Sequence, residues 1–295
     1  MSMTRTMAKA LAASPFFRKG RKLFEENRRA WDLPLSKLEK LQVGAYLILE
    51  DYSKSLFPPR FEDQAKAYAM EINYRTQLAG ISLETTRQTE LRKPFWFGRG
   101  GVEFLTGYSR LVTVLEQLKV SPPSRLLELG CGTGWMAEFL AITGFDVVAT
   151  SIALTDIADA QRRQQSIVAK GLEAKLRFEI AAMESVVETV GPRNHYDAVL
   201  VFEALHHAFD WRKTVQSAFD CLRPGGWILI CNEPNVLHTF ISYRAAKLVN
   251  THEIGFSRGE LRRHLSVTGF TEVKYLGSSL HLWTKKHWFV AQKPA

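Results

Sequence analysis

The stretch "RLLELGCGTGWMAEFL", residues 125–140, decides the fold, because it joins an apolar run to a helical pattern through three glycines. Gly130, Gly132 and Gly134 occupy alternate positions where a strand should pass into a helix. Glycine weakens both kinds of element, so its use here indicates a sharp turn that another group approaches closely. The stretch therefore predicts a strand, a ligand-binding turn and a helix that offers free N–H groups.

Short apolar runs alternate with helical patterns from about residue 120 onward. The expected strands after the first are "DVVATS", "KLRFEIA", "YDAVLVFEAL", "GGWILICNE", "TEVKYLG" and a last one within "HLWTKKHWFVAQK", with helices between most of them. This alternation indicates a parallel sheet covered on both faces. Ligands of such sheets bind beyond the carboxyl ends of the strands, where the strand order reverses.

The first 120 residues have a different pattern. Apolar residues recur at helical spacing in "LSKLEKLQVGAYLILEDYSKSLF", residues 35–57, and in "EFLTGYSRLVTVLEQLKV", residues 103–120. The aromatic and glycine-rich "LRKPFWFGRGG", residues 91–101, reads as a loop, and "SPPS" at 121–124 marks a break. We therefore divide the chain into an N-terminal helical region, 1–119, that covers the site as a lid and selects the acceptor, and a sheet domain, 120–295.

Composition limits the classes of protein to consider. The chain has 295 residues, of which 46% are hydrophobic and 23% charged, as in one large or two small globular domains. No apolar run approaches the ~20 residues of a membrane-spanning helix. Cys131, Cys221 and Cys231 lack the spacing of metal ligands and fit a reducing compartment. We expect a cytoplasmic protein.

Positive charge is concentrated near the N-terminus. The formal net charge is +9, and the first thirty residues hold eight Lys and Arg side chains against Glu25 and Glu26. Such a segment suits nucleic acid, an anionic lipid surface or an acidic substrate, and it also suits a helix face that is simply solvated. Peripheral membrane contact therefore stays open, and the sequence does not indicate the oligomeric state.

The glycine spacing discriminates among ligands. A dinucleotide fingerprint is G-x-G-x-x-G, but here Trp135 stands where its third glycine belongs. The G-K-[ST] of a phosphate-binding P-loop is absent. The remaining pattern, E-x-G-x-G-x-G, resembles the nucleotide loop of the class I S-adenosylmethionine-dependent methyltransferases.

Three later stretches extend this resemblance over residues 120–295. They are "YDAVLVFEALHHAFDW" (196–211), "LRPGGWILICNEP" (222–234) and "HEIGFSRGELRRHLSVTGF" (252–270), which are similar in order to the fourth-strand motif of the small-molecule branch, the turn before the fifth strand and the late helix. The resemblance implies an α/β fold with a Rossmann-like, doubly wound seven-stranded sheet. Most of its strands would be parallel and the last antiparallel, with the helical region as an N-terminal extension.

The resemblance also implies S-adenosylmethionine as cofactor, lying over the glycine turn and the next strand ends. The residues assigned to it on this basis are Glu128, Gly130, Cys131, Gly132, Gly134, Ser151, Ile152, Met183, Glu184, Phe202 and Arg99.

Two positions depart from the family pattern. Ser151 stands where the second strand usually ends in an acidic residue that holds the ribose hydroxyls. The absence of that carboxylate would weaken cofactor binding by ~1–3 kcal/mol. Asp156, one helical turn later, is a possible replacement. Ala182 stands where an Asp often meets the adenine, and Met183 could pack on the adenine instead. Either backbone contacts and packing hold S-adenosylmethionine, or the protein uses a modified cofactor or has a different role.

Candidate catalytic residues follow the fourth strand. Methyl transfer to a hydroxyl needs a base, and "FEALHH" supplies Glu203, His206 and His207. Imidazole titrates near neutral pH, so we expect His207 to be the base, with His206 as second choice. Adjacent histidines rarely converge on one ion, and we expect no metal. Glu233, after the fifth strand, either contacts the acceptor or only belongs to a turn.

A small-molecule acceptor, methylated most simply on oxygen, is the preferred function. Nucleic acid is a less favoured partner, because the [DNS]-P-P-[YFW] motif of amino-group methylation and a Pro-Cys nucleophile are both absent. The alternatives are a methyltransferase acting on RNA or protein, which the basic N-terminus supports, and a non-catalytic binding module, which Ser151 and Ala182 support.

Overall fold

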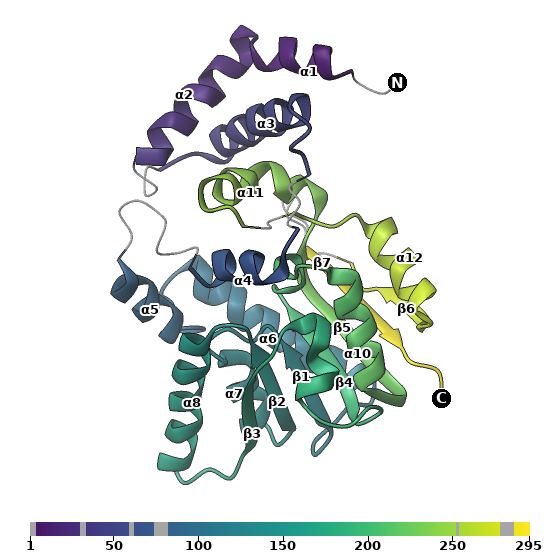
Figure 1. Ribbon diagram of the computed structural model, residues 1–295. Coiled ribbons are helices and arrows are strands. Elements are labelled where there is room, and N and C mark those ends of the chain that lie inside the picture. The colour runs from purple at the N-terminus through teal and green to yellow at the C-terminus, as the bar shows by residue number, and fades with distance from the viewer. Residues whose placement is uncertain (1–3, 30–33, 59–61, 74–81, 252–253, 278–285) are drawn as a thin grey trace. The chain divides into compact units, whose positions relative to one another are not determined.

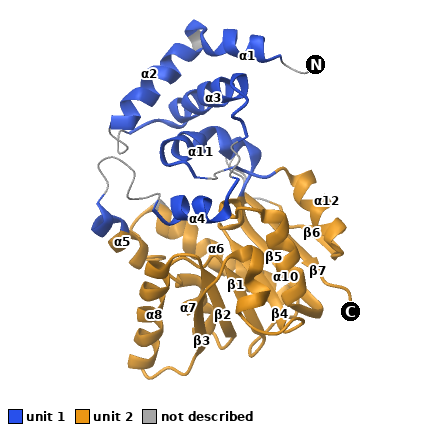
Figure 2. Cartoon of the chain, in the orientation of Figure 1, with its two compact units in different colours: residues 1–86, 234–256, 282–284 blue, residues 87–233, 257–281, 285–295 orange. Residues whose placement is uncertain are grey.

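The computed structural model describes the chain except for residues 1–3, 30–33, 59–61, 74–81, 252–253 and 278–285. Its described residues form two compact units, which Figure 2 shows in different colours. Each unit has a hydrophobic core of its own. Unit 1 draws its residues from Met1–Thr86 and Pro234–Phe256, and unit 2 from Arg87–Glu233, Ser257–His281 and Lys285–Ala295.

Unit 2 is built on a seven-stranded sheet with the order β3-β2-β1-β4-β5-β7-β6 (Figure 1). Pairing is parallel from β3 through β5, and β7 is antiparallel to β6. The strand order reverses between β1 and β4, where sheets of this kind bind ligands. The predicted doubly wound, Rossmann-like sheet is confirmed. The strands are β1 (Arg125–Leu129), β2 (Asp146–Ser151), β3 (Lys175–Ile180), β4 (Tyr196–Phe202), β5 (Leu222–Pro234), β6 (Thr271–Tyr275) and β7 (Lys286–Gln292).

Helices connect and flank these strands. Each parallel strand of the central sheet is followed by helical structure, as the alternating sequence pattern predicts. Among the described ranges, no helix is both long and apolar enough to cross a bilayer. The elements are α5 (Leu83–Leu91), α6 (Arg99–Gln117), α7 (Trp135–Ile142), α8 (Leu154–Ala169), the 3-10 helix η2 (Met183–Ser185), α9 (Val186–Thr189), the 3-10 helix η3 (Leu205–His207), α10 (Trp211–Cys221) and α12 (Arg258–Thr268).

Apolar side chains fill both faces of the central strands. Residues 198–202 of β4 are all buried, which explains why this strand reads as a continuous apolar run. The Phe202 ring meets the Trp135 and Trp288 rings edge to face, at centroid distances of 6.0 and 6.1 Å. These rings close the core at the end of β4, so the residues that follow Phe202 are the first that can reach a ligand.

Unit 1 is a helical assembly in which α3 packs on α11 (Figure 1). The two helices approach closely at Gly44, where an added Cβ would lie 1.6 Å from the Phe240 carbonyl oxygen. A buried carboxylate also joins them: Asp51 accepts from the Tyr243 hydroxyl at 2.8 Å and from Lys247 Nζ at 2.7 Å. The helices are α1 (Arg5–Ala12), α2 (Pro15–Arg29), α3 (Lys37–Ser53), α4 (Gln64–Asn73) and α11 (Val236–Val249).

The units divide the chain at points that differ from the expected boundary at 119/120. Residues 87–119 belong to unit 2, because α8 holds the segment that precedes α6. Arg163 donates to the carbonyl oxygens of Glu90, Leu91 and Lys93 at 3.3, 2.9 and 2.9 Å. Residues 234–256, where no helix was expected before position 252, join the N-terminal helices because α11 packs on α3.

Candidate functional site

The glycine turn links β1 to α7 at the point where the strand order reverses. Gly130, Gly132 and Gly134 have φ values of 73°, 53° and 76°, which other residues rarely adopt. An added Cβ would lie 2.6 Å from Ala204 Cβ at Gly130 and 2.6 Å from the Phe178 ring at Gly134. At Gly132 it would meet no described atom within 4 Å. Two glycines therefore fit the turn to its neighbours, while Gly132 leaves its backbone open to a ligand.

A carboxylate is buried under this turn. Glu128 of β1 is 3% exposed, and its Oε2 has no hydrogen-bond partner among the described residues. Desolvation raises the pKa of Glu128 to about 8, although a hydrogen bond from the Ala137 N–H acts in the opposite direction. Burial, followed by the fields of Glu128 and Asp156, raises the pKa of the Cys131 thiol far above its usual range. Cys131 is therefore not a reactive thiol, and the two carboxylates lie near it.

A polar pair lies at the end of β2. Ser151 is buried, accepts from the Ala153 N–H at 3.3 Å, and its Oγ donates to Asp156 Oδ2 at 3.4 Å. The first turn of α8 thus brings a carboxylate back to the strand end that lacks one of its own. Ile152, between them in the chain, is half-buried.

The residues after β3 have packing and loop contacts. Met183 is buried in η2, and its sulfur would lie 3.5 Å from a Cβ at Gly130. One oxygen of Glu184 accepts a hydrogen bond at 2.9 Å from the N–H of Asp210, and Asp210 is the N-cap residue of α10. Glu184 therefore fastens the loop before α10, a contact that the assignment to the cofactor did not include.

Of two further residues assigned to the cofactor, the structure describes the side chain of Phe202 but not that of Arg99. The Phe202 ring belongs to the core described above, and a Cβ at Gly107 of α6 would lie 2.7 Å from it. The Phe202 ring, which was expected at the cofactor, thus packs against α6, Trp135 and Trp288. Arg99 begins α6, but its side chain lies outside the described part of the chain.

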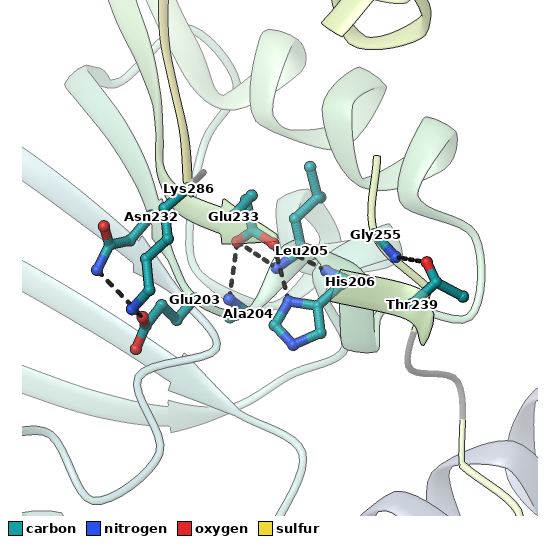
Figure 3. Close-up of polar contacts among 9 residues, drawn as sticks. All are labelled: Glu203, Ala204, Leu205, His206, Asn232, Glu233, Thr239, Gly255 and Lys286. Atoms are coloured by element: carbon teal, nitrogen blue, oxygen red, sulfur yellow. Dashed lines mark hydrogen bonds and ion pairs between the residues drawn. The ribbon is translucent and has the colours of Figure 1, made fainter. Parts of the chain in front are cut away.

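Glu203, at the end of β4, is engaged by neighbouring strands (Figure 3). Its carboxylate forms an ion pair with Lys286 of β7 and accepts from Asn232 Nδ2 of β5 at 3.1 Å. Glu203 and Asn232 have φ values of 51° and 61°, a conformation that costs energy outside glycine and concentrates at functional sites. The paired carboxylate is a weak candidate for a base, which lowers Glu203 among the predicted catalytic residues.

A histidine–carboxylate dyad follows directly. Glu233 of β5 is fully buried, and its Oε1 accepts from the N–H groups of Ala204 and Leu205 at 2.8 and 2.9 Å. Its Oε2 accepts from the His206 N–H at 3.2 Å and lies 2.8 Å from His206 Nδ1 (Figure 3). Glu233 thus holds the loop and orients the imidazole. Desolvation raises its pKa to about 7, against the pull of these N–H groups and of His207.

His207 adjoins this dyad. Its ring centroid lies 4.0 Å from that of His206, with the planes inclined by 41°. His206 is buried and oriented by Glu233, whereas His207 is half-buried. Both oxygens of Glu233 are thus engaged by the loop after β4, and the imidazole of His206 lies against this carboxylate. Within the described ranges, no group of three or more His, Cys, Asp or Glu side chains is arranged to hold a metal ion.

The pairing of Glu233 with His206 and of Lys286 with Glu203 was not anticipated. The signal for the first was present, because β4 and β5 were both expected to end at the same edge of the sheet. In the observed register Phe202 lies opposite Cys231, which brings the residues that follow β4 level with the last residues of β5, Glu233 among them. Lys286 gave no signal, because the antiparallel β7 reaches this edge at its first residue rather than its last.

Comparison with known proteins identifies the family. Residues 105–275 match the family model described as "Methyltransferase domain". The match covers more than half of the chain, which belongs to this family. The resemblance to the class I S-adenosylmethionine-dependent methyltransferases is thereby confirmed.

Individual relatives are distant. The chain is 29% identical over 104 residues to the "Ubiquinone biosynthesis O-methyltransferase" of Bordetella avium (strain 197N), covering 35% of this chain and 40% of that protein. It is 27% identical over 185 residues to an "O-methyltransferase" of Pyrenophora dematioidea, and this match covers 57% of this chain and 62% of that protein. The chain thus spans less than two thirds of the length of these two curated relatives.

The fold has solved counterparts. Magnesium protoporphyrin IX methyltransferase from Synechocystis PCC 6803, solved with bound SAH, superposes with a TM-score of 0.57 and covers 77% of this chain and 99% of its own. The sequence identity is 15%, so this likeness concerns the fold alone.

The residues present fit S-adenosylmethionine, the methyl donor of the class. Gly132 leaves open space at the turn, and Glu128 keeps one buried oxygen for a donor group of a ligand. Asp156, carried by α8 and bonded to Ser151, offers the acidic group that β2 itself lacks. A carboxylate is therefore present at the end of β2, although it belongs to α8 rather than to the strand.

Proposed function

We propose that this chain transfers a methyl group from S-adenosylmethionine to an oxygen atom of a small-molecule acceptor. The observation that carries the proposal is the 2.8 Å contact between His206 Nδ1 and the buried Glu233, beside the glycine turn at the edge of one sheet. The O-methyltransferase names of two relatives support the choice of oxygen.

His206 is the proposed base. With Glu233 ionised, Nδ1 keeps its proton and donates it to Oε2, which leaves Nε2 as an acceptor. Nε2 takes the hydroxyl proton of the acceptor, and the oxygen becomes a nucleophile. When bound, S-adenosylmethionine supplies an electrophilic methyl group on its sulfonium. Such a base contributes roughly 10²–10⁴ in rate.

Other residues hold the donor. Glu128 and the Gly132 backbone face the donor's polar groups, and Asp156 with Ser151 takes the ribose hydroxyls. Met183 packs beside the turn and limits access of water. Glu203 contributes through its ion pair with Lys286, which fixes the strand ends around the acceptor. The N-terminal helical region selects the acceptor, and the protein acts in the cytoplasm.

The first experiment measures donor binding. Calorimetric titration with S-adenosylmethionine and S-adenosylhomocysteine should give micromolar affinity for the wild type and no binding for Gly132→Arg. Gly171→Arg is the matched control: Gly171 also has a positive φ, of 71°, and no described atom within 4 Å of an added Cβ. Equal binding by wild type and Gly132→Arg, or no binding by the wild type, would contradict the proposal.

The second experiment identifies the acceptor atom and the base. Methyl transfer is followed on a set of phenols, catechols, carboxylic acids and amines, with RNA and protein as further acceptors. We expect activity on phenolic hydroxyls, a loss of about 10²–10⁴ in kcat for His206→Asn, and a smaller loss for His207→Asn. A larger loss of kcat for His207→Asn would instead identify His207 as the base, as expected from the sequence. Transfer only to RNA or protein, or donor binding without any transfer, would favour one of the alternatives.

A further inference from the structure

Helices α1 and α2 carry most of the positive charge of the chain. Residues 5–29 contain eight Lys and Arg side chains and two Glu side chains, a net charge of +6 out of the +9 of the whole chain. The remaining residues, although ten times as many, are close to neutral. Such local concentration of one sign indicates a surface that meets an anionic partner.

Helix α2 has two distinct faces. Gly20, Phe24 and Asn27 are buried, and Phe24 belongs to the core of unit 1 beside α3. Arg18, Lys22 and Arg29 are exposed at spacings of four and seven residues, which places them along one stripe of the helix. The stripe lies opposite the buried face, so three cations point away from the body of unit 1.

Neighbouring acids do not neutralise this stripe. Lys22 lies 3.9 Å from Glu26, and Glu25 is 3.5 Å from Arg28; all four side chains are largely exposed. For Arg18 and Arg29, none of the described carboxylates lies within ion-pair distance. Exposed pairs of this kind contribute little, so the side chains can exchange partners for external anions.

Helix α1 also carries exposed apolar side chains. Met7 and Leu11 of α1 are 56% and 42% exposed and lie one helical turn apart, with the exposed Lys9 between them in the chain. Helices that lie in a membrane interface typically carry basic residues on one side and exposed aliphatic residues on another, and Lys9, two positions from both Met7 and Leu11, lies on a different side of α1 from them. Single-stranded nucleic acid is instead held by exposed aromatic rings, and the described rings of α1 and α2, Phe17 and Phe24, are half-buried and buried.

We propose that α1 and the Arg18–Lys22–Arg29 stripe of α2 dock this protein on an anionic phospholipid bilayer. The cations contact lipid phosphates, and Met7 and Leu11 enter the boundary between headgroups and acyl chains. The proposal concerns where the protein acts and does not rest on the choice of base or acceptor atom.

Co-sedimentation with vesicles tests the proposal on the full chain. We expect binding to phosphatidylcholine vesicles that contain roughly 30% phosphatidylglycerol, weak binding to phosphatidylcholine alone, and loss of binding at about 0.5 M salt. Removing the stripe with R18Q/K22Q/R29Q should weaken binding about 100-fold. Removing the apolar pair with M7Q/L11Q should weaken it about 10-fold or more.

A charge-matched control separates this surface from net charge. K170Q/K175Q/K213Q removes three exposed lysines of unit 2 and should bind vesicles like the wild type. Circular dichroism and the affinity for S-adenosylhomocysteine check that each variant is folded. No binding of the wild type to anionic vesicles, or equal losses in the stripe and control variants, would refute the proposal. Tight RNA binding that M7Q/L11Q leaves unchanged, without vesicle binding, would assign the surface to nucleic acid instead.

Discussion

Replacing Glu128 by glutamine should stabilise the ligand-free protein at alkaline pH and weaken its binding of S-adenosylhomocysteine. The carboxylate is buried, and one of its oxygens has no partner among the described residues, so its charge is held without solvation or a counterion. Glutamine has nearly the same shape but no charge. The same feature that makes Glu128 available to a ligand therefore destabilises the protein when the ligand is absent.

The magnitude follows from the pKa. Burial raises the pKa of Glu128 to about 8, from 4.5 in a solvated carboxyl. Between these values the folded protein keeps a proton that the unfolded chain has lost, so the contribution to stability is complete below pH 4.5 and is lost as the pH rises through 8. Each pH unit in this window is worth about 1.4 kcal/mol, which gives a loss of about 3 kcal/mol between about pH 5.5 and about pH 8.5.

Urea denaturation at these two pH values measures the effect, with Glu138→Gln as the matched control. Glu138, of α7, is also buried but lies 2.8 Å from Arg163 Nη1. Its replacement leaves a buried guanidinium without its counterion and should lower stability by about 3 kcal/mol or more at either pH. Glu128→Gln should instead exceed the wild type by about 1.4 kcal/mol near pH 5.5 and by about 4.5 kcal/mol near pH 8.5, because the charge penalty of the wild type begins at the pKa of the unfolded chain.

The binding assay completes the test. Glu128→Gln should bind S-adenosylhomocysteine at least about 10-fold more weakly, because one charge-assisted hydrogen bond is worth about 1.5–3 kcal/mol. A variant that is less stable than the wild type at alkaline pH would refute the account of the buried charge. Unchanged binding would show that Glu128 does not face the cofactor.

Three further predictions concern other parts of the chain. Glu233→Gln should lower kcat about 10²–10⁴-fold, because the glutamine amide nitrogen would face the His206 N–H and favour the wrong imidazole tautomer. In the wild type, kcat should rise with pH through about 7, as Glu233 ionises. A kcat that does not change with pH would exclude the His206–Glu233 dyad. Asp156→Asn should weaken S-adenosylhomocysteine binding about 10-fold by calorimetry, with Ser151→Ala smaller; a larger effect at Ser151 would contradict the assignment. Gly44→Ala should destabilise the protein by about 1–3 kcal/mol in urea, since its Cβ would overlap the Phe240 carbonyl; unchanged stability would contradict the tight helix crossing.

The sheet was predictable because its signals are local. Each strand is an apolar run of a few residues, and the glycines of 130–134 are required by the turn's own backbone conformation. The order of motifs along the chain then sufficed to name the family. The open space at Gly132 is also a local property, since it depends on the turn and the helix that follows it.

The candidate site depended on register and on side-chain choices that the sequence does not encode locally. His206 and Glu233 lie 27 positions apart, and only the alignment of β4 with β5 makes them partners. Phe202 was assigned to the cofactor from its position at the end of a strand, and only the structure shows that its ring packs against Trp135 and Trp288. The division into compact units differs from the expected boundary for a similar reason, because no motif in the sequence indicates that α11 packs with helices almost 200 residues earlier.

That last arrangement has a consequence for synthesis on the ribosome. The Asp51 carboxylate is satisfied by Tyr243 and Lys247, so α3 cannot bury its charge until the chain has grown by a further 192 residues or more. At roughly 5–20 residues per second, α3 waits about 10–40 s with an apolar face uncovered. The parallel strands β1 to β5 of unit 2 are made within that interval, whereas α12, β6 and β7 are made only after α11, so neither unit can be complete before α11 emerges. The first third of the chain is then the portion that needs protection longest.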